Sequence, residues 1–101
     1  MIFGLSEDQF KILNTILIQP LKQKKAKVYI FGSRARGKFH PYSDVDVLFE
    51  EAPDSLISSE ELASIKEELE ESRLTVKVDV VNFKNLAQSF LNSVLSERVE
   101  I

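Results

Sequence analysis

Strand-type and helix-type segments alternate along this chain, and that alternation constrains the fold more than any other feature. Three segments have the composition and period of strands: residues 28–31 are a short apolar run, while residues 44–49 and 75–81 alternate between apolar and polar side chains. Apolar residues at helical spacing lie before, between and after them. The order α-β-α-β-α-β-α predicts an α/β fold with a small mixed sheet, of three strands or slightly more, flanked by helices.

The helical segments carry recognisable start signals. Ser6 with Gln9, and later Ser58 with Glu61, have the spacing of a capping box. We expect a first helix that ends near Pro20, a turn or two of helix at residues 33–36, a helix after Ser58, and a last helix over residues 84–96. The apolar residues expected to face inward from the last helix are Leu86, Phe90, Leu91, Val94 and Leu95, with residues 98–101 left as a tail.

Length, charge and residue usage bound the function. A chain of 101 residues predicts a single domain over residues 1–101. It carries 13 Lys and Arg against 16 Asp and Glu, a net charge of −3, so we expect no stable binding to nucleic acid. The absence of cysteine excludes disulfides and thiolate catalysis. No apolar run approaches the roughly 18 residues that span a bilayer, and no signal peptide is recognisable, so we expect a cytoplasmic protein without membrane association.

A Gly-Ser turn is the first candidate functional element. Gly32 and Ser33 follow a strand and precede a short helix, where backbone N–H groups and a hydroxyl can bind an anion. The alternative is that Ser33 only caps the helix. Arg34 and Arg36 come next, and guanidinium groups suit phosphate oxygens, although either could instead form a surface ion pair. Gly32, Ser33, Arg34 and Arg36 are therefore candidates to bind phosphate groups.

Two aspartates form the second element. Asp44 and Asp46 alternate with valines, so both project from one face of a strand. Aspartate is disfavoured in strands, and neighbouring like charges are destabilising unless a cation lies between them. An exposed sheet face is the alternative. Hard carboxylate oxygens at this spacing are suited to Mg²⁺, which usually completes its coordination with water and substrate phosphates.

A third acidic residue, Asp79, occurs in the last predicted strand, on the face opposite to the valines at positions 76, 78 and 80. It could complete a metal-binding triad with Asp44 and Asp46, or accept a proton from an attacking hydroxyl. The alternative for Asp79 alone is an ion pair with Lys77. The combination of an anion-binding turn, a carboxylate pair and a third carboxylate is far more specific than any one part.

The stretch from Gly32 to Glu50, GSRARGKFHPYSDVDVLFE, together with Asp79, resembles the signature of the nucleotidyltransferase superfamily that includes DNA polymerase beta. It is most similar to the minimal nucleotidyltransferase (MNT) antitoxins. The resemblance implies that Asp44 and Asp46 bind two Mg²⁺ ions, and that Asp79 binds one metal and activates the acceptor. It implies that Gly32 and Ser33 hold the triphosphate of ATP.

The same resemblance implies a partner. Minimal members act on a helical ribonuclease toxin of the HEPN class, encoded adjacently, and transfer AMP from ATP to a tyrosine hydroxyl of that toxin with release of pyrophosphate. A hetero-oligomer with the toxin is the expected assembly. Two alternatives remain: a non-catalytic antitoxin that neutralises its partner by occlusion, and a nucleotidyltransferase for small molecules of the aminoglycoside type.

Overall fold

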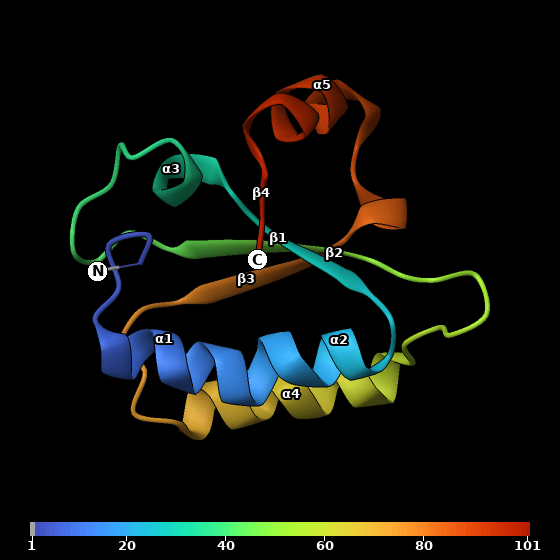
Figure 1. The fold of residues 1–101 in the computed structure, drawn as a ribbon, viewed down its shortest axis with the longest axis horizontal. Helices are drawn as coiled ribbons and strands as arrows, with labels where there is room; N and C mark the ends of the chain where they lie inside the picture. Colours follow the sequence, from blue (N-terminus) through green and yellow to red (C-terminus); the bar gives the residue numbers. More distant parts are fainter. Residues whose placement is uncertain (1) are drawn as a thin grey trace.

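The computed structural model describes residues 2–101 and contains a four-stranded mixed sheet in the order β3-β2-β1-β4 (Figure 1). Its strands are β1 (Lys27–Phe31), β2 (Val45–Glu50), β3 (Val78–Asn82) and β4 (Val99–Glu100). β1 pairs antiparallel with β2 and with β4, whereas β2 pairs parallel with β3. The predicted α/β class and mixed sheet are confirmed, and the sheet has one strand more than the three that the sequence pattern indicated.

The added strand corrects the prediction that residues 98–101 form a tail. β4 pairs with Tyr29 and Ile30 of β1, and the N–H of Ile101 donates to the carbonyl of Val28 at 3.0 Å. Two residues are too few to show a period, so no local sequence pattern indicated this strand. The pairing satisfies backbone groups of β1 that would otherwise lack partners.

The N-terminal helical stretch runs from Glu7 to Gln23 in three parts: α1 (Glu7–Leu13), the π-helix η1 (Asn14–Ile18) and α2 (Gln19–Gln23). The predicted capping box of Ser6 and Gln9 is confirmed in both directions. The predicted end near Pro20 is wrong. In the π-helix, the Gln19 N–H donates to the carbonyl of Asn14, five residues back. Pro20 then falls in the first turn of α2, where a residue without an N–H is tolerated.

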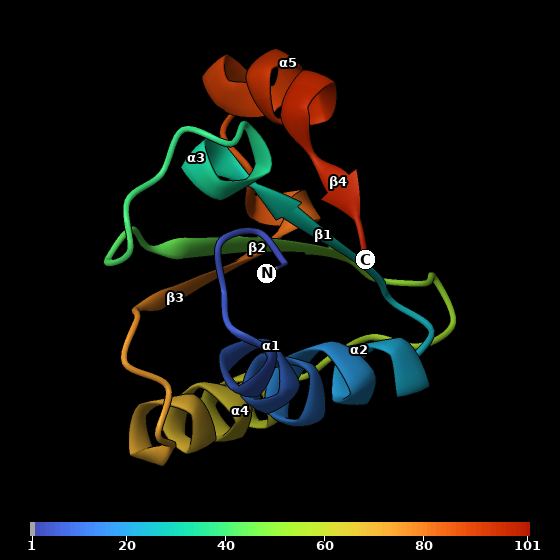
Figure 2. The same ribbon diagram turned by 60° about the vertical axis from the view of Figure 1, so that its left-hand side comes forward.

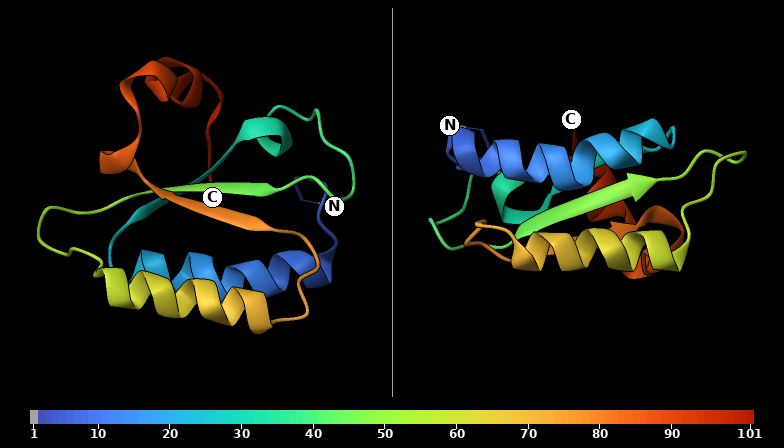
Figure 3. Two further views of the ribbon diagram at one scale, coloured as in Figure 1. Left: turned by 180° about the vertical axis from the view of Figure 1, so that it is seen from behind. Right: turned by 90° about the horizontal axis from the view of Figure 1, so that it is seen from below.

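The main core lies between one face of the sheet and a single layer of helices. α4 (Ser59–Glu71), capped by Ser58 as predicted, runs beside the N-terminal helical stretch beneath the sheet (Figure 3). The buried side chains that meet there come from every second position of β1 and β2, and from the helices: Val28, Ile30, Val45, Val47, Phe49, Leu13, Leu17, Leu21 and Leu69. Within residues 2–101, no helix combines the length and apolar character that crossing a membrane requires.

The opposite face of the sheet is covered more thinly, by α3 (Gly32–Ala35), the 3-10 helix η2 (Phe83–Asn85) and α5 (Gln88–Glu97) (Figure 2). Its buried cluster consists of Tyr29, Leu48 and Val94. Residue 84 lies in the 3-10 helix η2, so the last helix begins at Gln88 rather than at the predicted residue 84. Phe90 and Leu95, predicted to face inward, are 62% and 42% exposed, because α5 buries only its Val94 side against this small cluster.

Candidate active site

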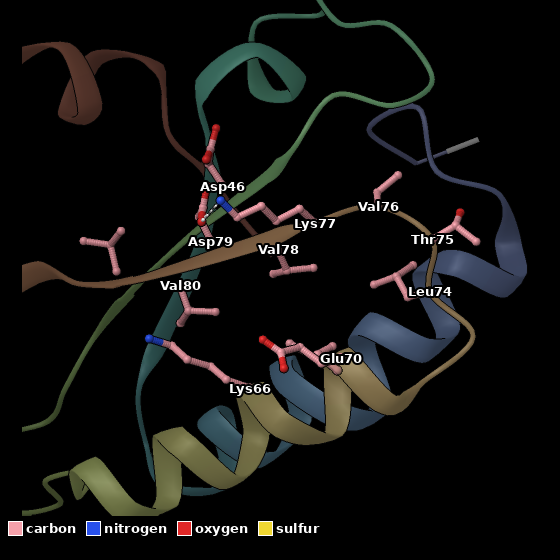
Figure 4. A pocket seen from close by; sticks show the side chains of 12 residues that line it. Asp46, Lys66, Glu70, Leu74, Thr75, Val76, Lys77, Val78, Asp79 and Val80 are labelled. Carbon is pink, nitrogen blue, oxygen red and sulfur yellow. Dashed lines mark ion pairs between the residues drawn. The ribbon is translucent and has the colours of Figure 1, made fainter.

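Asp46 and Asp79 lie side by side on the thinly covered face. They are paired residues of the parallel strands β2 and β3, and neighbouring strands are about 4.8 Å apart. In Figure 4 both carboxylates point away from α4, whereas Val78 and Val80 point toward it. Asp44 is exposed and immediately precedes β2, two residues before Asp46. The alternation of the two strands thus places carboxylates from separate segments on one face.

The Gly-Ser turn begins directly beside Asp46, because Phe31, the last residue of β1, is the cross-strand partner of Asp46. Gly32 has φ +75°, in the left-handed region that favours glycine. A side chain at position 32 would collide with the Asp46 carboxylate. Glycine is therefore required here both by the backbone conformation and by the close approach of Asp46. Ser33 follows in the first turn of α3.

The surroundings of Asp46 disfavour the ionised form of its carboxylate. Its pKa is raised above the ordinary value by burial first, and then by the negative charges of Asp79, Asp44 and Glu97, while Arg36 partly offsets the rise. Burial disfavours the ionised form and neighbouring like charges add to that effect. A cation bound beside Asp46 would favour the ionised carboxylate again.

Lys77 already places one positive charge at this position. Its Nζ lies 3.6 Å from Oδ1 of Asp79, and the ion pair is drawn in Figure 4. This is the pair that the sequence offered as the alternative role of Asp79. The side chains of Lys77 and Asp79 are 71% and 43% exposed, so the pair contributes little to stability and leaves Asp79 accessible.

The chemistry of the donor set suits magnesium. Within residues 2–101, no group of three or more His, Cys, Asp or Glu side chains is arranged to enclose a metal ion. Asp46 and Asp79 nevertheless offer hard oxygen donors on adjacent strands, with Asp44 two residues away. Mg²⁺ typically takes one or two protein carboxylates and completes its octahedron with water and substrate phosphates. The residues present therefore fit Mg²⁺ bound together with a phosphate ligand.

Arg34 has a different role from the one that the sequence indicated. It is only 2% exposed, and its guanidinium donates to the backbone carbonyls of Phe3, Pro41 and Ser43 at 2.8–3.3 Å. The Phe39 ring lies 5.2 Å from its Cζ. These contacts fasten the loop before β2 to the N-terminal segment. The structure thus directs Arg34 at backbone carbonyls of the protein itself, and the expectation that it binds nucleotide phosphate draws no support from this arrangement.

Arg36 is half exposed and forms an ion pair with Glu97, the last residue of α5, at 2.7 Å from Nη1 to Oε2. The other oxygen of Glu97 accepts the N–H of Gly32 at 3.1 Å. Sequence reasoning did not identify Glu97. One signal was present: an acidic residue at the end of a helix is disfavoured by the helix dipole, and so calls for a compensating partner.

A groove of about 700 Å³ adjoins the aspartates. It runs between the open edge of β3 and α4, with Asp46 and Asp79 near one end and Lys66 and Glu70 along the helical wall (Figure 4). β3 is an edge strand, so no other strand closes this side. Asp46 and Asp79 thus form one end of the groove, while their carboxylates point away from α4.

Comparison with known proteins places this geometry in a family. The profile of the nucleotidyltransferase domain matches residues 11–101. The chain belongs to this family. A structure described as a candidate minimal nucleotidyltransferase is 26% identical and superposes with a TM-score of 0.70, over 96% of this chain and 97% of that one. With the resemblance in the motif residues, these findings identify a minimal nucleotidyltransferase.

Two further solved structures share the fold of this nucleotidyltransferase. A toxin-antitoxin complex with AMP-PNP is 21% identical, with a TM-score of 0.64 over 86% of this chain and 70% of the other. A complex of a tri-AMPylated Shewanella oneidensis HEPN toxin with its MNT antitoxin is 22% identical, with a TM-score of 0.59 over 91% and 70%. A search of curated proteins found no match.

Proposed function

We propose that this minimal nucleotidyltransferase is an antitoxin that transfers AMP from ATP to a tyrosine hydroxyl of a HEPN-type ribonuclease toxin. The observation that carries the proposal is the juxtaposition of Asp46 with Asp79 and with the Gly32 turn. A nucleotidyl transfer needs carboxylates beside an anion-binding turn, because the reaction brings a triphosphate and an acceptor hydroxyl to one point.

The roles of the chain's own residues follow from their positions. The Gly32 N–H and the Ser33 backbone and hydroxyl hold the phosphates, and Arg36 neutralises phosphate charge. Asp79, at the edge strand and open to the groove, takes the proton of the acceptor hydroxyl. The hydroxyl oxygen forms a bond to the α-phosphorus, the bond from that phosphorus to the β-phosphate oxygen breaks, and pyrophosphate leaves.

Asp44, Asp46 and Asp79 would hold Mg²⁺, in two ions if the site follows the superfamily. When bound, Mg²⁺ supplies electrostatic stabilisation of the oxygens that enter and leave the α-phosphorus. The raised pKa of Asp46 supports this assignment, because a carboxylate crowded by other carboxylates favours a bound cation. Lys77 would have to leave Asp79 when the ion enters.

The choice of partner is supported by the fold neighbours. One of them is a toxin-antitoxin complex with a nucleotide analogue, and another is an antitoxin with an AMPylated HEPN toxin. By extension we take a HEPN toxin as the acceptor and a hetero-oligomer as the assembly. The Asp79 side chain is 43% exposed on the edge strand β3, so an acceptor side chain can reach its carboxylate.

The test is transfer of AMP to the HEPN protein encoded beside this chain. The toxin is incubated with this protein, ATP and Mg²⁺, and its intact mass is measured. We expect added AMP units with the wild type and none with Asp44→Asn or Asp46→Asn. Asp54→Asn is the matched control, because Asp54 is an exposed aspartate paired only with Lys25. An unmodified toxin, with both proteins folded, would refute the proposal.

A second candidate is neutralisation by occlusion alone. It is favoured by apolar side chains exposed on α5 and β4, namely Phe90, Leu95 and Val99. Toxin neutralisation that survives the Asp44→Asn/Asp46→Asn double substitution but is lost on Phe90→Ser would support this candidate over catalysis. Turnover of small hydroxylated acceptors without any toxin would instead favour the small-molecule alternative.

A further inference from the structure

The Glu97 carboxylate accepts hydrogen bonds from two donors of the candidate site that could otherwise bind a phosphate. One of its oxygens accepts the Gly32 N–H at 3.1 Å and the other accepts from Arg36 at 2.7 Å. Its side chain is only 18% exposed, so the contact is sheltered from water. Glu97 also lies close enough to Asp46 to disfavour ionisation of that carboxylate. A carboxylate therefore takes the place of an external anion at the Gly-Ser turn.

The position of Glu97 is held from the sheet side. The next residue, Arg98, places its guanidinium 4.1 Å from the centre of the Tyr29 ring and 5.8 Å from that of Phe83. Such stacking is attractive at short range. The β4 pairing follows immediately and fixes the chain after α5. The chain directly after Glu97 is thus tied to β1, and α3 and α5 lie against each other (Figure 2).

The local energetics of Glu97 are unfavourable apart from these two contacts. It is the last residue of α5, where the partial negative charge of the helix end opposes a carboxylate. It also adds a negative charge near Asp46. The carboxylate itself is held by the Gly32 N–H and by Arg36, so a ligand that takes those donors releases the carboxylate, while Arg98 and β4 keep the backbone in place.

We propose that Glu97 sets the nucleotide affinity of the site, by occupying the Gly32 N–H and the Arg36 guanidinium until a triphosphate displaces it. The inference rests on the proposed function, which places phosphate oxygens on these donors. The carboxylate and the triphosphate compete for the same groups. The measured association constant therefore equals the intrinsic constant multiplied by the fraction of molecules in which Glu97 has left these donors. Between turnovers, Glu97 covers the turn that has released its nucleotide.

The test is calorimetric binding of AMP-PNP with Mg²⁺ to the full-length protein and to Glu97→Gln. The substitution keeps the shape and removes the charge, which weakens a charge-assisted contact, so we expect binding to become about tenfold tighter. Glu100→Gln is the matched control: it changes the net charge equally, three residues away, at an exposed position in β4. It should leave the affinity unchanged.

A second variant and a second probe guard against a structural artefact. Glu97→Asp keeps the charge but is one methylene shorter, so it should give a smaller gain in affinity. Inorganic tripolyphosphate without metal should follow the same order as AMP-PNP, because the competition concerns phosphate alone. A variant with a lowered melting temperature is compared at a temperature where it is folded.

The outcomes separate this inference from the proposed function. Unchanged or weaker binding by Glu97→Gln, while the wild type binds AMP-PNP and transfers AMP, would overturn the role of Glu97 and leave the proposed function intact. Absence of nucleotide binding by the wild type and by both Glu97 variants would refute both. Tighter binding by Glu100→Gln to the same degree would attribute the effect to net charge and overturn the inference.

Discussion

Replacing Gly32 by alanine tests the contact between the turn and Asp46. Two separate penalties act on this substitution. The backbone at position 32 has φ +75°, and the new Cβ would collide with the Asp46 carboxylate. Gly37 provides the control, because its φ is +73° and nothing lies within 4 Å of an added Cβ. Gly37→Ala therefore carries only the backbone penalty, and the difference between the two variants isolates the steric one.

The magnitudes follow from these two penalties. A non-glycine residue in the left-handed region lowers the free energy of unfolding by about 1–2 kcal/mol. Forcing extra atoms into a packed position lowers it by about 1–3 kcal/mol more. Gly37→Ala should thus lower the free energy of unfolding by about 1–2 kcal/mol, and Gly32→Ala by about 2–5 kcal/mol. In a domain of this size, each kcal/mol corresponds to a fall in melting temperature of about 4–8 °C.

Urea titration of both variants, followed by circular dichroism, measures the difference directly. Gly32→Ala must also displace the Asp46 carboxylate, so it should abolish AMP transfer, whereas Gly37→Ala should keep it. Equal losses of stability in the two variants would contradict the reasoning, because the packing of Asp46 against Gly32 would then carry no free energy.

Three further predictions concern charged side chains. The raised pKa of Asp46 means that the wild type loses stability as the pH rises above 3.8 through that pKa, so Asp46→Asn should be more stable than the wild type at pH 7 without metal, in thermal unfolding. A less stable Asp46→Asn protein would contradict this. Arg34→Lys cannot reproduce the fork to three carbonyls and should lower the free energy of unfolding by about 2–3 kcal/mol, whereas the exposed Arg73→Lys should have no measurable effect in the same urea assay. Hydrogen bonds from Asn82 and Ile57 lower the pKa of Glu51, so the stability that its charge provides is present at neutral pH and lost as the pH falls below 4.5; Glu51→Gln should abolish that part of the acid dependence.

The two-residue period of the strands made most of the candidate site predictable from the sequence. Alternation with period two assigns Asp46 to the face opposite Val45 and Val47, and Asp79 to the face opposite Val78 and Val80. Gly32, as the residue after a buried strand, was found by the same local pattern. These residues could be predicted because their geometry depends on neighbours one or two positions away.

The remaining features depend on contacts that no local pattern encodes. Glu97 meets Gly32 across 65 positions of the chain. Arg34 was a candidate phosphate ligand because a guanidinium group suits phosphate oxygens, but carbonyls from the N-terminal segment and from the loop before β2 surround it in the folded chain. The sequence could not indicate that the helix passes through Pro20, because a π-helix has no distinct apolar period.

A crystal structure with AMP-PNP and Mn²⁺, which is located by its anomalous scattering, tests the central claim most directly. The account predicts metal peaks at the carboxylates of Asp46 and Asp79, with phosphate oxygens on the Gly32 and Ser33 backbone and Glu97 displaced. Nucleotide bound elsewhere, or metal peaks remote from both aspartates, would contradict it.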